Sequence, residues 1–182
     1  EHGLNLDRGG GGENYRVTFR PYQSEYADVV LGEQINSWTD LGGGFYSKNF
    51  SGLGFDISSV KAIEEGASGL LEFDSLASLQ NLSYAPGVNA FYVNDGTQVV
   101  YLRLNALTPS DIFFVDIDAE VNVISPYITW QNLTLSYAHQ GFDVDWYGVW
   151  DSYSEHGRNF KLLDSTVRHT YSDGLNSRAA NL

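Results

Sequence analysis

Three carboxylates in the C-terminal third of the sequence have the clearest potential for chemistry. Asp143 and Asp145 are two residues apart, so a strand would present both on one face, and Asp173 precedes Gly174. Two carboxylates can cleave a glycosidic bond, because one protonates the leaving oxygen while the other activates water or attacks the sugar. We therefore predict Asp143, Asp145 and Asp173 as catalytic candidates. The alternative is that the first two are solvent-facing strand residues and that Asp173 shapes a turn.

The segment between Asp145 and Gly157 is unusually aromatic. It carries Trp146, Tyr147 and Trp150, followed by His156. Sugar rings pack their C–H faces on aromatic rings, and Trp and Tyr add a polar tip that can bond to hydroxyls. These four residues are predicted to bind substrate, although the rings could instead fold back against the protein.

Basic residues gather after this segment, at Arg158, Lys161, Arg168 and His169. A polysaccharide lyase needs a base to remove the proton beside a uronate carboxylate and a cation to stabilise the charge that forms. Arg168 and His169 are therefore added to the predicted substrate-binding set. The competing interpretation is a charged strand face that only contacts solvent.

A repeat over residues 127–182 indicates the elements that would position these side chains. Apolar residues recur 32 positions apart and alternate within each copy: Ile128 with Phe160, Trp130 with Leu162, and Leu135 with Val167. Gly141 and Phe142 recur as Gly174 and Leu175. A fixed period with internal alternation is typical of stacked strands in a β-solenoid. Asp143 would then lie one strand spacing, about 4.8 Å, from Asn176.

The alternation also predicts which side chains face the core and which face solvent. The residues predicted to point inward are Ile128, Trp130, Leu133, Leu135, Phe142, Val144, Phe160, Leu162, Val167 and Leu175. Those predicted to point outward include Thr129, Thr134, Asp143, Lys161, Thr166 and Arg168.

The earlier part of the chain predicts further β-structure in three segments: 1–36 as the first solenoid coils, 37–110 as an inserted β-rich module, and 111–182 as further coils. Strands are expected over 15–22, 27–32 and 112–118. Asp95-Gly96 between the runs 91–93 and 98–104 predicts a hairpin in which Gly takes a positive φ. Residues 74–79 could form a helical turn begun by an Asp or Ser cap.

The composition excludes several kinds of partner. A net charge of −13 argues against nucleic acid and anionic membranes. No apolar run approaches the roughly 20 residues that span a bilayer, so membrane insertion is not expected. The acidic side chains Asp116, Asp118 and Glu120 alternate and could bind Ca²⁺, but a solvated strand face is the favoured interpretation. The four histidines lack zinc-ligand spacing, so we predict no metal and no cofactor.

Several stretches resemble the right-handed parallel β-helix proteins of the pectate-lyase-like superfamily. Residues 16–22 and 29–32 resemble an early coil, residues 86–104 a hairpin that precedes the main helix, and residues 127–134 and 172–175 the starts of later coils. The resemblance implies an all-β fold, a right-handed parallel β-helix with an inserted module.

The same resemblance implies a function for the full-length protein. It would be a bacterial, extracellular or periplasmic enzyme that cleaves a polysaccharide, as a glycoside hydrolase or a polysaccharide lyase. Family members usually stack more coils and hold their catalytic residues on the middle ones, so we expect this chain to be an N-terminal part. The alternatives are a non-catalytic glycan-binding adhesin or stalk, and a phage tailspike, which is usually a trimer. The oligomeric state is left open.

Overall fold

The computed structural model describes residues 3–7, 9–23, 25–54, 56–67, 69–81, 87–144 and 159–177, and it is almost entirely β-structure. The chain divides into two compact units, which are described separately. Unit 1 comprises Glu1–Leu31 and Asp118–Leu182, and unit 2 comprises Gly32–Ile117. The domain limits expected at 36/37 and 110/111 stay predictions. The strand that begins at Ile112 pairs within unit 2, so the parallel strands of unit 1 resume at Val121.

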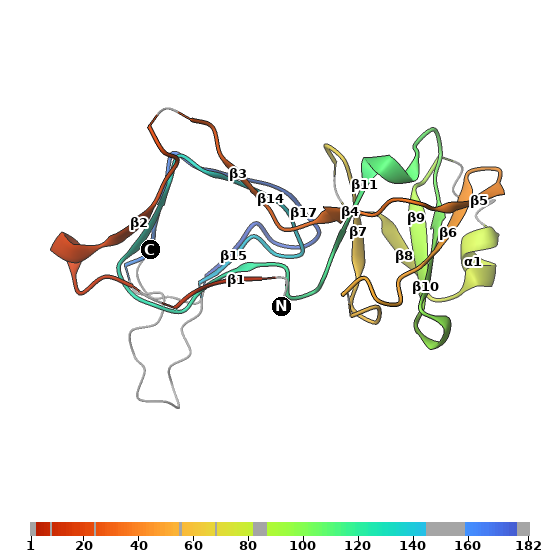
Figure 1. Ribbon diagram of the computed structural model, residues 1–182, viewed down its shortest axis with the longest axis horizontal. Helices are drawn as coiled ribbons and strands as arrows, with labels where there is room; N and C mark the ends of the chain where they lie inside the picture. Colours follow the sequence, from red (N-terminus) through yellow and green to blue (C-terminus); the bar gives the residue numbers. More distant parts are fainter. Residues whose placement is uncertain are drawn as a thin grey trace. The chain divides into compact units, whose positions relative to one another are not determined.

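In the described part of unit 1 the strands form three parallel sheets, which lie along the three sides of a triangular outline (Figure 1). Sheet A contains β1 (Leu4–Leu6), β12 (Val121–Val123), β15 (Phe142–Val144) and β18 (Leu175–Ser177). Sheet B contains β2 (Val17–Phe19), β13 (Ile128–Gln131) and β16 (Lys161–Leu163). Sheet C contains β3 (Asp28–Val30), β14 (Thr134–Ala138) and β17 (Thr166–Thr170). The chain visits sheets A, B and C in the same order in three successive repeats, an arrangement consistent with a β-helix.

The strand register confirms the predicted repeat. Trp130 pairs with Leu162, Leu135 with Val167, and Phe142 with Leu175. Sheet A also contains a shorter step, because Val121 pairs with Phe142, only 21 positions later. The 32-residue spacing in the sequence therefore belongs to the repeat that contains residues 145–158.

The core of unit 1 follows from the alternation of apolar residues. Ile128, Trp130, Leu133, Leu135 and Phe160 are buried in one cluster with Phe142 and Val144, and Leu162 and Val167 pack against it, as predicted. The Trp130 and Phe142 ring centroids are 5.1 Å apart. Burying one such side chain stabilises the fold by about 1.5–3 kcal/mol. Leu175, also predicted to point inward, is 43% exposed on the last described strand.

Arg16 joins all three repeats, and its contacts explain why Thr129, which was predicted to face solvent, is buried. Arg16 Nε donates to Thr129 Oγ1 at 2.8 Å, and its Nη2 donates to the carbonyls of Ile128, at 2.9 Å, and Asn159. Its Nη1 lies 3.2 Å from Glu13 Oε2, at the start of the 3₁₀ turn η1 (Glu13–Tyr15). Thr129 projects outward as expected, but it is only 5% exposed because Arg16 covers it.

The corners of the repeats share a backbone conformation. Tyr127, Asn132 and Tyr137 have positive φ, and so do Asn159, Asp164 and His169, each 32 positions later. Asn and Asp tolerate this left-handed conformation better than other non-glycine residues. The recurrence of Asn132 as Asp164, 32 positions later, therefore has a conformational basis.

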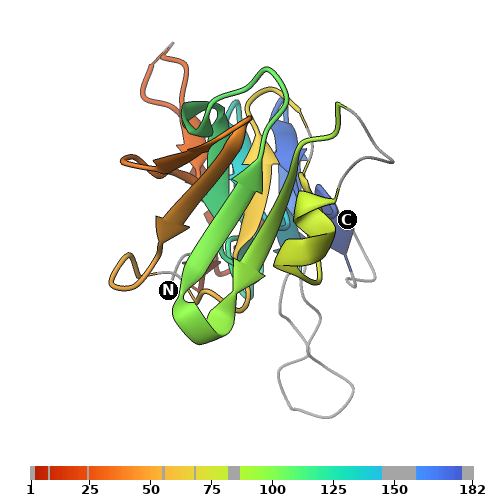
Figure 2. The same ribbon diagram turned by 90° about the vertical axis from the view of Figure 1, so that its right-hand side faces the viewer.

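The described residues of unit 2 form two sheets. The larger one has the order β5 (Thr39–Gly42), β6 (Phe45–Asn49), β10 (Val99–Arg103), β9 (Ala90–Asn94) and β8 (Leu71–Phe73). The smaller one has the order β4 (Glu33–Gln34), β11 (Ile112–Val115) and β7 (Lys61–Glu64). The helix α1 (Leu76–Gln80) lies over β9 of the larger sheet (Figure 2). An aromatic cluster in this unit consists of Trp38, Phe50 and Phe114. The ring centroid of Phe114 lies 5.4 Å from that of Trp38 and 5.2 Å from that of Phe50.

The local signals predicted in unit 2 are confirmed, with one change. Strands β9 and β10 form the expected hairpin, and Ser75 caps α1 by accepting from the Ser78 N–H. The residue with positive φ in the hairpin loop is Gln98 rather than Gly96, because the 3₁₀ turn η3 (Asp95–Thr97) fills the loop first. A second 3₁₀ turn, η4 (Pro109–Asp111), leads into β11.

Candidate functional site

The connection between β2 and β3 forms an open recess of about 700 Å³ in unit 1. Its lining residues are Arg20, Pro21, Tyr22, Gln23 and Glu25 from the connection and Gln131 and Asn132 from the second repeat. Pro21 cannot extend β2, because it lacks the N–H that a strand neighbour would use. The chain therefore leaves the sheet and returns at Asp28, whereas β13 and β14 are joined directly through Asn132 and Leu133.

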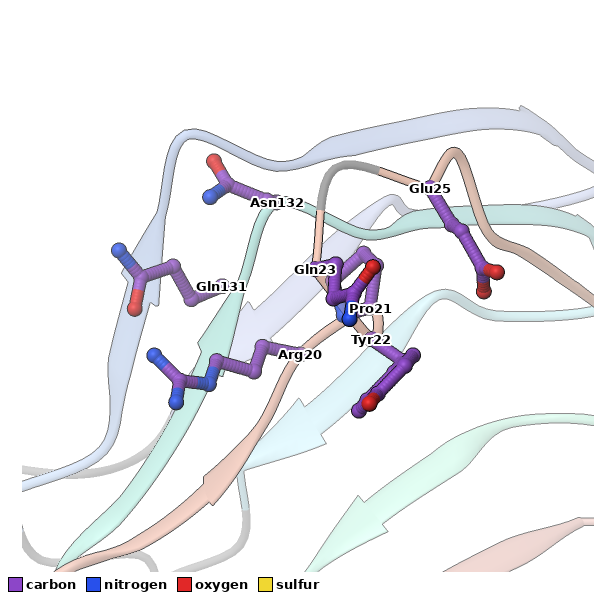
Figure 3. Close-up of a pocket in the computed structure, with 7 residues that line it drawn as sticks. All are labelled: Arg20, Pro21, Tyr22, Gln23, Glu25, Gln131 and Asn132. Atoms are coloured by element: carbon purple, nitrogen blue, oxygen red, sulfur yellow. The ribbon is translucent and has the colours of Figure 1, made fainter.

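Polar groups and an aromatic ring both line the recess (Figure 3). Arg20 and Gln131 project to the same side of their paired strands, and the Asn132 side chain extends beside them. Tyr22 and Glu25 lie on the other side of the loop tip at Gln23. Tyr22 is 73% exposed, so its ring is available to a ligand.

A hydrogen-bonded cluster continues from this connection onto the outer face of sheet C. Ser136 Oγ donates to Asp28 Oδ1 at 2.8 Å, and Arg168 Nη2 lies 2.9 Å from Asp28 Oδ2. The Tyr26 hydroxyl donates to Thr134 Oγ1 at 3.1 Å. The hydrogen bond to Asp28 raises the pKa of Arg168 above its ordinary value. These contacts join all three repeats and hold the polar groups in fixed positions.

The predicted binding residues Arg168 and His169 therefore occupy different environments. Arg168 belongs to the cluster on sheet C, while the His169 ring stacks on Tyr137 at a centroid distance of 5.1 Å. Sequence reasoning missed Tyr22, Tyr26 and Asp28 as site residues. The available signal was a pair of tyrosines flanking a polar loop directly after Pro21.

The predicted catalytic carboxylates are only partly described. Asp143 is half-buried on β15 and pairs in register with Asn122 on one side and Asn176 on the other, so the expected neighbour of Asp143 is confirmed. Asp173 lies in the turn before β18, where its carbonyl accepts from the Gly141 N–H at 2.9 Å, two positions before Asp143. The described residues thus place Asp143 on sheet A and Asp173 in the turn that leads into β18. Five of the predicted site residues lie outside the described residues: Asp145, Trp146, Tyr147, Trp150 and His156. The catalytic set and the substrate-binding set therefore stay predictions.

The acidic run considered for Ca²⁺ is divided between the two units. Asp116 is 6% exposed, and its carboxylate accepts from the Asp56 N–H and the Ser59 hydroxyl, so the expected solvated face is wrong at this position. The described part of the chain contains no group of three or more His, Cys, Asp or Glu side chains that could hold a metal ion. It also contains no helix long and apolar enough to span a membrane.

The fold belongs to the all-β class, with three parallel sheets in unit 1. No protein-family model and no curated protein matches the sequence. A solved structure described as XylC in complex with xylose matches with a TM-score of 0.60 and 13% sequence identity. The match covers 75% of this chain and 28% of that chain, so the chain spans just over a quarter of that protein. At this identity the comparison shows a likeness of fold.

Proposed function

We propose that the chain is a glycan-binding part of a carbohydrate-active protein and that unit 1 is a section of a right-handed parallel β-helix. The repeated order of sheets A, B and C and the likeness to XylC support this proposal. The bound xylose in that structure supports a saccharide as the class of ligand.

The observation that carries the proposal is the recess between β2 and β3. The exposed Tyr22 ring offers a flat surface for the C–H face of a sugar. Arg20, Gln131 and Asn132 supply donors and acceptors that match sugar hydroxyls, and Glu25 adds a carboxylate. The neighbouring cluster around Asp28 and Arg168 gives a longer glycan a second set of fixed polar groups.

For the complete protein, we propose cleavage of a polysaccharide by hydrolysis or by elimination. Asp143, Asp145 and Asp173 are the proposed catalytic residues within this chain. An exported location, extracellular or periplasmic, fits a substrate of this size. The alternative is a non-catalytic adhesin or stalk, which the surface of Tyr22 and the sheet C cluster would serve equally well.

Isothermal titration of the chain with a panel of oligosaccharides, including xylohexaose, tests the binding. We expect Tyr22→Ala to lower the affinity for the glycan at least about 10-fold, which corresponds to roughly 1.4 kcal/mol of binding free energy. Tyr15→Ala is the matched control, because Tyr15 is 77% exposed and lies in unit 1 outside the recess. Absence of binding across the panel, or equal losses in the two variants, would contradict the proposal.

A second experiment separates the enzyme from the adhesin. The complete protein is incubated with the polysaccharides that contain the bound units, and reducing ends and the ultraviolet absorbance of unsaturated products are measured. Reducing ends alone indicate a hydrolase, and both signals together indicate a lyase. Binding without either signal would favour the adhesin.

A further inference from the structure

Unit 2 contains a separate recess of about 350 Å³ on its five-stranded sheet. Its walls are the β5–β6 hairpin, with Leu41, Gly42, Gly43 and Phe45, together with Gln80 at the end of α1 and Arg103 on β10. Gly42 and Gly43 have positive φ, and a Cβ at either position would meet no atom within 4 Å. The hairpin side of the recess therefore includes open backbone that a ligand can approach closely.

Arg103 is held firmly in this recess. Its Nη1 donates to the Gln80 carbonyl at 2.7 Å and to the Leu79 carbonyl at 3.2 Å. Its guanidinium carbon lies 5.8 Å from the centre of the Phe45 ring. These contacts fix the plane of the guanidinium, so a ligand would meet a preorganised group.

The rest of that guanidinium is available. Within the described part of the chain, both hydrogen bonds of Arg103 use Nη1, and no carboxylate forms an ion pair with it. Lys61, by contrast, pairs with Glu72 at 2.6 Å in the same unit. The Nε–Nη2 edge of an arginine has the fork geometry that binds a carboxylate through two parallel hydrogen bonds.

Aromatic and hydroxyl groups continue the surface along the same face. Tyr101 lies two residues from Arg103 on β10, is half-buried and stacks on Tyr92 with ring centroids 6.2 Å apart. Ser47 pairs with Tyr101 on the neighbouring strand. Leu41, 54% exposed, adds an apolar surface at the recess.

We propose that this recess binds the carboxylate-bearing sugar of an acidic glycan, with the uronate carboxylate on the Nε–Nη2 edge of Arg103. The sugar ring packs against Leu41 and Phe45, and the glycan continues past Tyr101. Because the chain carries a net charge of −13, the site favours an isolated uronate unit over a continuous polyuronate, which the chain would repel. The saccharide class of the ligand rests on the proposed function, but this site shares no residue with the recess around Tyr22.

An NMR titration of the whole 182-residue chain tests the site with two probes of matched shape. Methyl β-glucuronide carries the carboxylate, and methyl β-glucoside has a hydroxymethyl group in its place. The Nε–H signal of Arg103, identified by its loss in Arg103→Lys, is expected to shift with the glucuronide and not with the glucoside. Arg103→Gln is expected to weaken glucuronide binding at least about 10-fold.

Arg103→Gln also removes hydrogen bonds to the end of α1, so this variant alone could lose binding through a change in the fold. A second variant therefore tests the site with Arg103 in place. Leu41→Asp places a carboxylate at the recess without changing Arg103. Because this carboxylate repels the uronate, the variant is expected to lower the affinity for the glucuronide to a similar extent. Leu53→Asp is the control, because Leu53 is also exposed and lies beyond the opposite end of β6. Tyr22→Ala is expected to leave glucuronide binding unchanged, which separates this site from the first one.

Three results would overturn the proposal. The glucoside could bind as tightly as the glucuronide, or Arg103→Gln and Leu41→Asp could both leave the affinity unchanged. Alternatively, acetate could shift the Arg103 signal with the same affinity as the glucuronide, which would reduce the recess to a simple anion site.

Discussion

Units 1 and 2 are both rich in β-structure, but different contacts hold them together. In unit 1, each parallel strand pairs with strands of the adjacent repeats, and Trp130 and its neighbours fill the space between the sheets. In unit 2, most strands pair antiparallel, and an aromatic cluster of Trp38, Phe50 and Phe114 forms part of the interior. A stack of repeats depends on contacts between neighbouring repeats, whereas a unit without repeats is less dependent on any one strand pair. This difference predicts distinct responses to mutation.

The largest expected effect comes from emptying each core in turn. Trp130→Ala and Phe114→Ala remove side chains that are 1% and 0% exposed, and each is expected to destabilise its own unit by about 3–5 kcal/mol. Thermal unfolding followed by calorimetry should show two transitions, of which each variant lowers one. Hydrogen exchange assigns the transitions to residues of unit 1 or unit 2. If both variants lowered a single common transition, the two units would unfold together and the comparison would fail.

A smaller effect is expected from the arginine that joins the repeats. Arg16→Met keeps much of the side-chain length but leaves the carbonyls of Ile128 and Asn159 without their donor. Loss of hydrogen bonds from a charged group is expected to lower the stability of unit 1 by about 1.5–3 kcal/mol. The measurement is the urea midpoint of the unit 1 transition.

Arg20→Met is the matched control for this variant. Arg20 is exposed at the end of β2, and such surface changes usually alter stability by no more than about 0.5 kcal/mol. Equal effects of the two substitutions, or a shift of the unit 2 transition by Arg16→Met, would contradict the role of Arg16 in joining the repeats.

The same contrast explains how much of the fold could be predicted. In unit 1, paired residues of neighbouring strands are separated by the period of the sequence repeat, so pairs such as Trp130 with Leu162 could be predicted from the sequence. The corner at Asn132 and Asp164 was also visible, because both residue types favour left-handed backbone. In unit 2, only the local hairpin of β9 and β10 and the Ser75 cap had signals of this kind. Its pairing of β6 with β10 joins residues 50 to 58 positions apart, and no sequence repeat indicates it.

The candidate sites were harder to predict for a physical reason. Arg168 was identified from its charge, but its partner Asp28 lies 140 residues away and comes close only when β3 and β17 flank β14. Arg103 was not predicted as a site residue, for a different reason. Its importance rests on the positions of Phe45 and the carbonyls at the end of α1, none of which carries a chemical motif.

The smallest expected effect concerns an exposed ion pair that links the first and third repeats of unit 1. Glu13 Oε2 lies 3.1 Å from Lys161 Nζ and 3.2 Å from Arg16 Nη1. The hydrogen bond from Lys161, helped by the charge of Arg16, lowers the pKa of Glu13 below its ordinary value of 4.5. A carboxylate whose pKa is lowered on folding stabilises the folded state above pH 4.5, and this contribution is lost as the pH falls through the folded pKa.

Glu13→Gln tests this linkage against Glu25→Gln, which removes an exposed carboxylate from the same unit. We expect Glu13→Gln to lower the unit 1 urea midpoint slightly at pH 7. This difference should disappear as the pH falls through the folded pKa of Glu13, below which the carboxylate is protonated in both folded and unfolded states. The difference at pH 7 should also shrink in salt, because the pair is open to solvent. The unit 2 midpoint should be the same in both chains at each pH, since Glu13 makes its ion pairs within unit 1. A difference that did not shrink as the pH was lowered would mean that Glu13 joins the repeats by packing, and the charge pair would not distinguish the two units.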